Sequence, residues 1–334
     1  MKILIYAPSY ERMKEELHSI VPALEPILMM PDGRLTQGGA DIAVDHISPE
    51  VAWPNTEVYM EGPVRDFMIA VLKSSSLKWV QTSSAGVEHP VFAAIVENGA
   101  KLTNSDAGSI GIAEFVISSV LGVFHPFEQR RKSQANKVWD RVGFREISGT
   151  NWVIIGFGNI GSEIGKRAHA FGANVIGIRR SAVSSDFATI VKPENMVDHL
   201  PSADVVVVAA ALTPETHHVI NAKTLSMMNN TSVLVNIGRG GHVDESALID
   251  SLNKGVPGTA ILDVFNEEPL PPESPFWNHP RVRMTAHTAA TSDGVRHRND
   301  HVFLENLKRY VTGEPLLHAV DPGMLATDTE NIKL

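Results

Sequence analysis

Gly156-Phe-Gly158-Asn-Ile-Gly161 is the stretch that decides the fold of this chain of 334 residues. It follows the apolar run Trp152-Val-Ile-Ile155, which predicts a strand, and it opens a segment with apolar residues at helical spacing. The first glycine permits a tight turn, the second lets the backbone approach a pyrophosphate, and the third allows close packing of helix on strand. Because a helix N-terminus also offers unpaired N–H groups to phosphates, the stretch predicts a dinucleotide-binding turn rather than a merely structural one.

Further strands and helices alternate on both sides of this turn. One series, which begins at Asn151, has short apolar runs that predict strands at residues 152–155, 174–178, 205–208, 233–236, 259–262 and 282–285. Before it, similar runs predict strands at residues 3–6, 26–29, 40–44, 78–81 and 101–103. Strands that alternate with helices form parallel sheets covered on both faces. We therefore predict an α/β protein whose second sheet is six-stranded, doubly wound and of the Rossmann type.

The segments between and after the two series predict the domain organisation. An apolar helix is expected from Ser109 to Phe124, and a charged helix that contains residues 129–139 follows it. A last helix, residues 302–310, comes after the second series is complete, so we expect it to fold back on the first domain. The predicted domains are residues 1–103 together with 291–334, and residues 104–290.

Composition narrows the class of protein and of partner. A chain of this length is long for one core, which agrees with two domains. Its net charge of −9 gives no support to nucleic acid or an anionic membrane as a partner. The absence of cysteine excludes disulfides, thiolate metal sites and cysteine nucleophiles. No segment reaches the roughly 20 apolar residues of a membrane helix, and the apolar run within residues 1–8 is too short for a signal peptide. We therefore expect a cytoplasmic protein.

The end of the second Rossmann strand bears on the choice of dinucleotide. Enzymes that use NAD place Asp or Glu there, about 20 residues beyond the glycine turn, to bind the ribose hydroxyls. This chain has Arg179-Arg180-Ser181 instead. Guanidinium groups bind phosphate in a bidentate manner, so these residues predict NADP(H) as the preferred cofactor and NAD(H) as the second choice. The alternative is a pair of solvated surface arginines.

Arg239, Glu268 and His287 each follow one of three successive predicted strands. In open α/β sheets ligands bind beyond the carboxyl ends of the strands, so the three side chains should face one crevice. Reduction of a 2-oxo acid needs a proton donor, for which His287 is suited, and a cation for the carboxylate, for which Arg239 is suited. Glu268 would orient the histidine ring and favour its protonated form. Each residue alone is weak evidence, because most of the 14 histidines in such a chain are structural or solvated.

A pair of histidines offers an alternative, metal-dependent chemistry. His297 and His301 lie four residues apart, which on a helix places them on one face as candidate ligands. Their neighbours Arg296, Arg298 and Asp300 are more typical of a charged helix surface, so we expect no metal. The two arginines either border a substrate or belong to that surface.

Several further segments occur in an order that identifies a family. They are Ser84-Ala-Gly-Val87, Gly111-Ile-Ala-Glu114, Leu212-Thr-Pro-Glu-Thr216, Asn236-Ile-Gly-Arg239-Gly240, Leu262-Asp-Val-Phe265, Glu268-Pro-Leu270 and Glu305-Asn-Leu307. Together with the glycine turn they resemble the D-2-hydroxyacid dehydrogenase family, over nearly the whole chain. The resemblance implies a Rossmann-type dinucleotide-binding domain and a discontinuous, flavodoxin-like substrate domain. It also implies a homodimer that interconverts a small 2-oxo acid and its D-2-hydroxy acid.

The same resemblance implies roles for individual residues. Arg239, Glu268 and His287 match the catalytic residues of the family, and the turn Ala85-Gly86-Val87 matches a backbone nest for the substrate carboxylate. Trp139 matches a recurrent tryptophan of the connector helix, for which packing is the expected role. With the arginines and serine above, the expected cofactor contacts are Gly156, Phe157, Gly158, Asn159, Ile160, Gly161, Arg179, Arg180, Ser181, Ala210, Ala211, Thr216, Ile237, Gly238 and Asp263. Of these, Ile237 and Asp263 are expected to hold the nicotinamide carboxamide.

Arg179 departs from the NAD-specific members of the family, which have an acid at this place. The departure points toward the NADPH-dependent glyoxylate and hydroxypyruvate reductases of the family. A nicotinamide-sensing binding protein, like the transcriptional corepressors that share this fold, is the alternative from another class, because such a protein retains the same residues. It would be expected to carry partner-binding extensions, whereas this chain is little more than the two-domain body.

Overall fold

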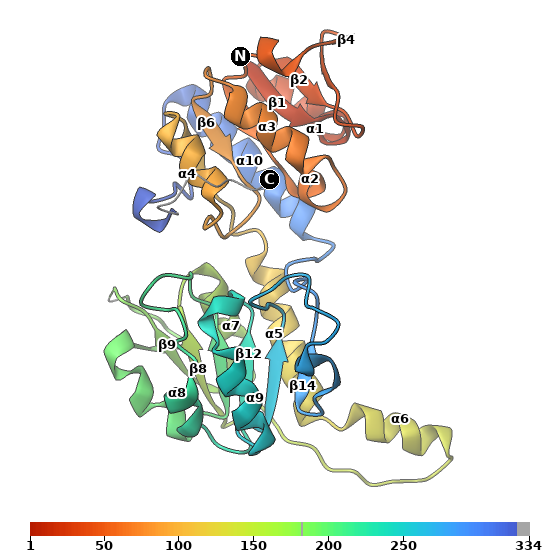
Figure 1. Ribbon diagram of the computed structural model, residues 1–334, viewed down its shortest axis with the longest axis vertical. Coiled ribbons are helices and arrows are strands. Elements are labelled where there is room, and N and C mark those ends of the chain that lie inside the picture. The colour runs from red at the N-terminus through yellow and green to blue at the C-terminus, as the bar shows by residue number, and fades with distance from the viewer. Residues whose placement is uncertain (182, 326–334) are drawn as a thin grey trace. The chain divides into compact units, whose positions relative to one another are not determined.

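The computed structural model describes residues 1–181 and 183–325, and it divides the chain into two compact units (Figure 1). The first unit consists of Met1–Gly108 together with the chain from Asp293 onward, and the second consists of Ser109–Ser292. The boundaries predicted from the sequence fall after residues 103 and 290. Each unit is an α/β structure, as predicted.

The second unit is built on a parallel sheet of seven strands. Their order is β10-β9-β8-β11-β12-β13-β14, with bounds Thr189–Val191, Asn174–Ile178, Asn151–Ile155, Val205–Val208, Val233–Asn236, Thr259–Leu262 and Val282–Met284. The doubly wound prediction is confirmed, because the strand order reverses between β8 and β11. The predicted count of six was wrong. The additional strand, β10, is only three residues long and lies at the edge beside β9, so its sequence carries little strand signal.

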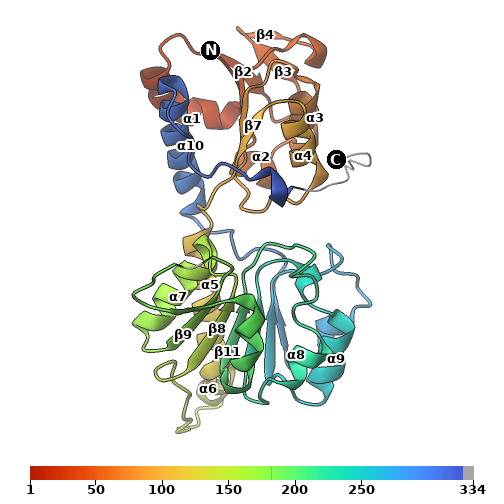
Figure 2. The same ribbon diagram turned by 90° about the vertical axis from the view of Figure 1, so that its left-hand side faces the viewer.

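Helices cover both faces of this sheet. On one face α5 (Ser109–Phe124) packs beside α7 (Asn159–Ala170), as Figure 2 shows. Side chains that alternate along the strands divide into two cores, so Trp152 and Ile154 face one layer of helices while Val153 and Ile155 face the other. The four valines of β11 are all buried, as expected for a central parallel strand without a solvated face.

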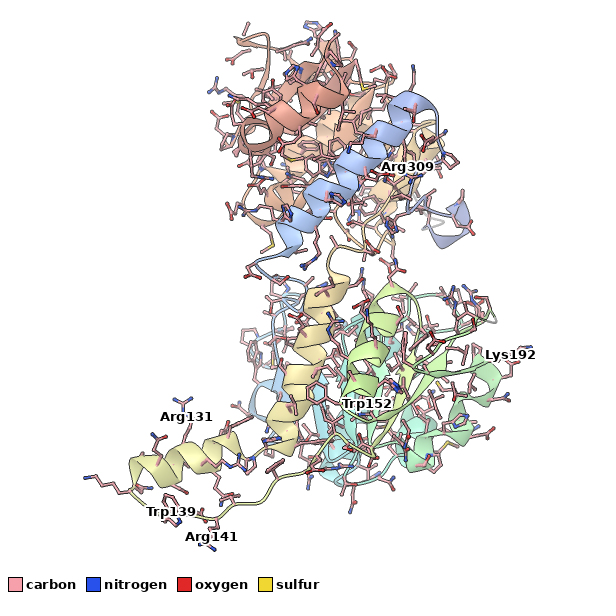
Figure 3. All side chains as sticks on the ribbon, turned by 180° about the vertical axis from the view of Figure 1, so that it is seen from behind. Arg131, Trp139, Arg141, Trp152, Lys192 and Arg309 are labelled. Carbon is pink, nitrogen blue, oxygen red and sulfur yellow. The ribbon has the colours of Figure 1, made fainter. Side chains whose placement is uncertain are left out.

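A projecting arm leaves the second unit after α5. Helix α6 (Phe127–Ala135) ends before the predicted residue 139, because Asn136 caps it and Lys137 adopts a positive φ of 57°. Trp139 therefore lies beyond the helix and is 92% exposed, so the packing role expected for it is not fulfilled within the chain. Figure 3 shows Trp139 on this arm together with Arg131 and Arg141.

The first unit contains a second sheet of seven strands. Their order is β4-β3-β2-β1-β5-β6-β7, with bounds Ala40–Asp41, Leu35–Gln37, Glu25–Met29, Lys2–Tyr6, Val51–Trp53, Trp79–Gln81 and Lys101–Thr103. Five of these strands run parallel in the flavodoxin-like order, namely β2, β1, β5, β6 and β7. Strands β3 and β4 are antiparallel to their neighbours. The strand predicted over residues 40–44 is reduced to two residues, and β3 and β5 were missed.

Five helices accompany this sheet: α1 (Ala7–Ile20), α2 (Thr56–Met60), α3 (Val64–Lys73), α4 (Pro90–Glu97) and α10 (Val295–Thr312). Helix α10 packs beside α1 (Figure 2), which confirms that the last helix joins the first part of the chain. Phe303 anchors it by stacking on Trp53, with ring centroids 4.1 Å apart. His297 and His301 both lie on this helix, and the described residues contain no group of three His, Cys, Asp or Glu side chains that could hold a metal.

An ion cluster around the buried carboxylate of Glu57 ties α10 to α1 and α2. The Glu57 carboxylate accepts hydrogen bonds from the Ser9 hydroxyl and from Arg12 Nη1 at 2.6 Å, and Arg296 Nη1 lies 3.5 Å from its other oxygen. Burial alone would raise the pKa of Glu57, but these hydrogen bonds and the charges of Arg12 and Arg296 outweigh burial and lower it. The Glu57 carboxylate therefore stabilises the first unit in its ionised form.

We expect Glu57→Gln to lower the stability of the first unit at pH 7 by about 2 kcal/mol, through loss of charge-assisted hydrogen bonds. Because the pKa of Glu57 is lowered in the folded state, its contribution is complete above the unfolded value of 4.5 and is lost as the pH falls through the folded value. Calorimetry should thus show a lower melting temperature for Glu57→Gln at pH 7 and a shrinking difference below pH 4.5. The exposed Glu15 provides the control variant, Glu15→Gln. A difference that persisted unchanged at pH 3 would contradict the account.

No single helix among the described residues is long and apolar enough to cross a membrane. Among the described residues, only α5 and α6 taken together have the length and apolar composition of a membrane span, and they are bent by 58° at their junction. Half of the residues of α5 are buried in the core of the second unit.

Candidate active site

The glycine turn joins β8 to α7. Gly156 has a φ of 93°, and a Cβ added there would lie 2.4 Å from the backbone of Ala210, so only glycine fits. A Cβ on Gly161 would lie 2.1 Å from the Gly156 oxygen, which explains the close approach of helix to strand. Gly158, by contrast, meets no described atom within 4 Å, and this open side lies at the N-terminus of α7, where a pyrophosphate could approach the backbone.

Phe157 turns inward from the same loop. Its ring is 3% exposed and fills the space above Gly177, where an added Cβ would lie 2.5 Å from the ring. The side chain therefore packs, and only the backbone of Phe157 faces the turn. The Phe157 oxygen accepts a hydrogen bond from Arg179 Nη1 at 3.2 Å.

Arg179 and Arg180 follow β9 and are exposed. Arg179 Nε donates to the Ser181 hydroxyl at 2.9 Å, so two contacts hold this guanidinium next to the glycine turn. A hydrogen bond with Thr213 lowers the pKa of Glu215, in the loop that follows β11, and the charge of Arg180 lowers it further. The observed arrangement is that of a basic, hydroxyl-bearing rim beside the turn, which fits a phosphate better than a bare ribose.

Thr216 closes the loop that follows β11. Its hydroxyl donates to the Ala211 oxygen at 2.7 Å and accepts from the Thr213 N–H at 2.8 Å. Ala210 lies directly against the glycine turn, as the contact with Gly156 shows. Ala210, Ala211 and Thr216 thus lie together in the loop that follows β11, and β11 pairs with β8, the strand that leads into the glycine turn.

His287 and Glu268 form the polar pair that the sequence analysis singled out. His287 Nδ1 lies 2.7 Å from Glu268 Oε2, and Glu268 Oε1 accepts the Phe265 N–H at 2.9 Å, so both side chains are oriented. His287 has a positive φ of 53°, a strained backbone conformation for a residue with a side chain. Half of its side chain is exposed, so the ring is reachable from solvent.

Asp263 holds the loop that carries His287. The Asp263 backbone oxygen accepts the His287 N–H at 2.8 Å. Its carboxylate, 2% exposed, accepts from the Thr285 hydroxyl at 2.6 Å, from the Thr288 N–H at 2.8 Å and from the Ala289 N–H at 3.0 Å. These bonds flank the strained residue on both sides and explain how it is maintained. Sequence reasoning found Asp263 only by resemblance and did not find this contact.

Arg239 lies in the turn that follows β12. Asn236 Nδ2 donates to the Arg239 oxygen at 2.9 Å, and the Arg239 N–H donates to His242 Nδ1 at 3.0 Å. Arg239 Nη1 donates to the Gly238 oxygen at 2.7 Å, so the guanidinium is held against its own turn. Since β12, β13 and β14 are adjacent, Arg239, Glu268 and His287 all follow the carboxyl ends of neighbouring strands.

The predicted substrate nest lies in the first unit, after β6. In the part of the chain that the structure describes, the N–H groups of Ala85, Gly86 and Val87 donate no hydrogen bond. The loop is held instead by the Ser84 hydroxyl, which donates to the Gly86 oxygen at 2.8 Å, and by Asn104 Nδ2, which donates to the Ala85 oxygen at 2.7 Å. Successive N–H groups of this kind suit a carboxylate.

Arg296 and Arg298 serve the first unit. Arg296 lies 3.5 Å from Glu57 and 3.6 Å from Glu61, while Arg298 Nε donates to the Ala107 oxygen at 2.7 Å. Both arginines have partners within their unit, which favours the charged-surface interpretation over a substrate contact.

A dinucleotide turn, a basic rim and an oriented His–Glu pair beyond neighbouring strands define a nicotinamide-dependent oxidoreductase. Comparison with known proteins identifies the family. The D-isomer specific 2-hydroxyacid dehydrogenase NAD binding domain matches residues 117–289. The chain belongs to the D-isomer specific 2-hydroxyacid dehydrogenase family, whose members are NAD(P)-dependent.

Curated relatives and solved structures agree with this assignment. A glyoxylate/hydroxypyruvate reductase from Arabidopsis thaliana is 30% identical over 77% of this chain and 80% of its own length. A D-3-phosphoglycerate dehydrogenase from Methanocaldococcus jannaschii is 32% identical over 72% of this chain but only 47% of its own length. Among structures, the NADPH-dependent glyoxylate/hydroxypyruvate reductase from Sinorhizobium meliloti, in complex with NADP, has 27% identity and a TM-score of 0.73, covering 97% and 98% of the two chains. A D-isomer specific 2-hydroxyacid dehydrogenase from Xanthobacter autotrophicus, in complex with NADPH, has 26% identity and a TM-score of 0.74, covering 96% and 98%.

Proposed function

We propose that this protein is a cytoplasmic, NADPH-dependent reductase that converts glyoxylate, hydroxypyruvate or a similarly small 2-oxo acid into the D-2-hydroxy acid. The observation that carries the proposal is the contact of His287 Nδ1 with Glu268 Oε2 at 2.7 Å. Glu268 follows β13 and His287 follows β14, and β13 lies between β14 and β12, the strand that Arg239 follows. Names of relatives support the substrate class, since the reductases from Arabidopsis thaliana and Sinorhizobium meliloti act on glyoxylate and hydroxypyruvate.

Each polar residue has a distinct task in the proposed reaction. When bound, the nicotinamide would be the hydride donor for the carbonyl carbon. His287 Nδ1 is engaged by Glu268, so Nε2 is the ring atom that donates the proton to the carbonyl oxygen. Arg239 binds the substrate carboxylate and stabilises the negative charge that develops on the carbonyl oxygen. The N–H groups of Ala85, Gly86 and Val87 provide further donors for the carboxylate.

The remaining predicted residues are assigned to the cofactor. Gly156, Gly158 and Gly161, with the backbone of Phe157, Asn159 and Ile160, receive the pyrophosphate, while Ala210, Ala211 and Thr216 border the adenosine. Ile237, Gly238 and Asp263 border the nicotinamide. For Asp263 the backbone is the better candidate, because its carboxylate oxygens already accept hydrogen bonds from three donors beside His287, namely Thr285, Thr288 and Ala289.

Steady-state kinetics with a panel of acids tests the proposal. NADPH and NADH oxidation would be followed with glyoxylate, hydroxypyruvate, pyruvate and phenylpyruvate. The highest kcat/KM is expected for glyoxylate or hydroxypyruvate with NADPH. If phenylpyruvate were preferred, the substrate class would be wrong while the reaction stood. Absence of turnover on all four acids, with tight binding of NADPH, would favour the nicotinamide-sensing alternative.

We expect Arg179→Ala to lower kcat/KM for NADPH by about 10- to 100-fold, since hydrogen bonds to a charged phosphate are lost. The value for NADH should change less than about two-fold, because NADH has no 2′-phosphate for the guanidinium to bind. Lys254 is an exposed cation at the C-terminus of α9 (Glu245–Asn253), before β13 begins, so Lys254→Ala is the matched control. Equal losses with both cofactors would show that Arg179 supports the turn and does not select the phosphate.

We also propose that the arm around α6 forms a homodimer. Four large apolar side chains on this one projecting segment are half or more exposed: Phe127, Val138, Trp139 and Phe144. Exposed apolar clusters of this kind mark protein interfaces. The double variant Val138→Asp, Trp139→Asp should shift the protein from dimer to monomer in analytical ultracentrifugation. Trp277 is 50% exposed elsewhere in the second unit, so Trp277→Asp is the control and should leave the dimer intact. A monomeric wild-type protein would refute the proposal.

A further inference from the structure

His242 is a fully buried histidine that the proposed reaction does not use. It is 0% exposed and lies in the turn after β12, three residues beyond Arg239. The sequence around it, Arg239-Gly240-Gly241-His242, showed no sign that the histidine had a role. A buried polar ring is costly unless it forms hydrogen bonds, so its contacts indicate what it does.

The ring of His242 is bonded to the main chain of Arg239. The Arg239 N–H donates to His242 Nδ1 at 3.0 Å, and the same ring nitrogen lies 3.0 Å from the Arg239 oxygen. The His242 N–H in turn donates to the Arg239 oxygen at 3.2 Å. Side chain and main chain of His242 thus hold both polar groups of the Arg239 peptide backbone.

The same ring also defines the shape of the turn before Arg239. It packs against Gly238, where an added Cβ would lie 3.0 Å from His242 Nδ1. The Gly238 oxygen is the atom that accepts Arg239 Nη1 at 2.7 Å. Contacts of one buried ring therefore fix the backbone of Arg239 and the carbonyl group that orients its guanidinium.

Main-chain contacts anchor His242 itself. Its backbone oxygen accepts the Ile220 N–H at 3.0 Å, and the next residue, Val243, forms a parallel bridge with Ile220. Ile220 and Val243 are both buried in the core beneath the sheet. The ring is thus supported by rigid structure, which is what a residue that positions another must have.

We infer that His242 is a positioning residue for Arg239, and that it fixes the guanidinium that binds the substrate carboxylate. The inference rests on the proposed function, because it takes Arg239 as the carboxylate ligand. A guanidinium without this support would sample more orientations, so carboxylate binding would weaken more than cofactor binding. Its effect should be seen in KM and in the binding of an unreactive dicarboxylate, rather than in the affinity for NADPH.

Three variants at position 242 separate positioning from packing. His242→Leu has a similar volume but no acceptor. His242→Asn can place its amide oxygen near the position of Nδ1, whereas His242→Gln places its amide near Nε2 and leaves the Nδ1 position without an acceptor. Melting temperatures would be recorded first. If His242→Leu fails to fold, the comparison of Asn with Gln tests the same point with two polar side chains.

Oxalate binding to the NADPH complex, measured by isothermal titration calorimetry, is the readout. We expect His242→Leu and His242→Gln to weaken oxalate about 10-fold and to raise KM for glyoxylate similarly, with the Kd for NADPH within about two-fold of the wild-type value. His242→Asn should restore most of the affinity. Wild-type oxalate affinity in His242→Leu or His242→Gln, or equal impairment of Asn and Gln, would overturn the inference.

Arg239→Gln distinguishes the two ways in which the test could fail. If Arg239→Gln abolishes oxalate binding and the position 242 variants do not weaken it, only the positioning role is wrong. If Arg239→Gln binds oxalate normally, the proposed carboxylate site is wrong, and the positioning role of His242 is overturned with it.

Discussion

Replacing His287 by glutamine should lower kcat for 2-oxo acid reduction by about 10³-fold, since general acid catalysis contributes about 10²- to 10⁴-fold. Glutamine keeps a polar group of similar length but cannot deliver a proton at neutral pH. The Glu268 carboxylate would remain oriented by the Phe265 N–H at 2.9 Å, so the variant removes the acid with little other change. Single-turnover kinetics under saturating NADPH would measure the loss in the chemical step.

The affinity of His287→Gln for NADPH should stay within about two-fold of the wild-type value, because the acid acts on the substrate carbonyl and not on the dinucleotide. His169, an exposed histidine at the end of α7, provides His169→Gln as the matched control. A loss of kcat smaller than about 10-fold in His287→Gln would contradict the assignment of the proton donor, since a group at the reacting carbonyl is worth more.

Arg239→Gln should lower kcat/KM by about 10³-fold, because it removes both a bidentate carboxylate contact and stabilisation of the developing oxyanion. Arg239→Lys should recover only part of this loss. A lysine keeps the charge but has no planar fork with which to bind two oxygens at once. Measured separately, KM should rise in both variants, whereas kcat should fall further in Gln than in Lys.

One result would contradict the assignment of Arg239 as the ligand of the substrate carboxylate. If Arg239→Gln kept its kcat and KM, the carboxylate would have to be bound elsewhere, and the N–H groups of Ala85, Gly86 and Val87 would be the remaining donors. Gly238→Ala is unsuitable as a control, since its Cβ would lie 3.0 Å from the His242 ring and disturb Arg239 itself.

Local sequence patterns predicted most of the fold because they coincide with its strongest physical constraints. The turn beginning at Gly156 requires glycine for steric reasons, and the four valines of β11 are apolar because both of their faces are buried. Strands β3, β5 and β10, each three residues long, were missed, whereas the equally short β6, β7 and β14 were predicted. Three residues are too few for periodicity to decide between strand and loop. The end of α6 was placed too late, because charged residues such as those after Ala135 are compatible with either helix or loop.

The candidate site was only partly accessible to sequence reasoning. Arg239, Glu268 and His287 were singled out because each follows a predicted strand, and the sheet order places those strands next to one another. The hydrogen bonds of Asp263 to the His287 loop and those of His242 to Arg239 were not predicted. Both depend on side-chain hydrogen bonds, which appear only when a turn is closed, and neither leaves a periodic pattern in the sequence. The positive φ of His287 was not predicted either, because most histidines have a negative φ and no local pattern marks the exceptions.

The most direct test of the central claim is the configuration of the product formed from hydroxypyruvate. Wild-type protein would be incubated with hydroxypyruvate and NADPH, and the glycerate separated by chiral chromatography. The account predicts D-glycerate, formed in equal amount to the NADPH consumed, with none of it produced by His287→Gln in the same time. Formation of L-glycerate, or consumption of NADPH without glycerate, would contradict it.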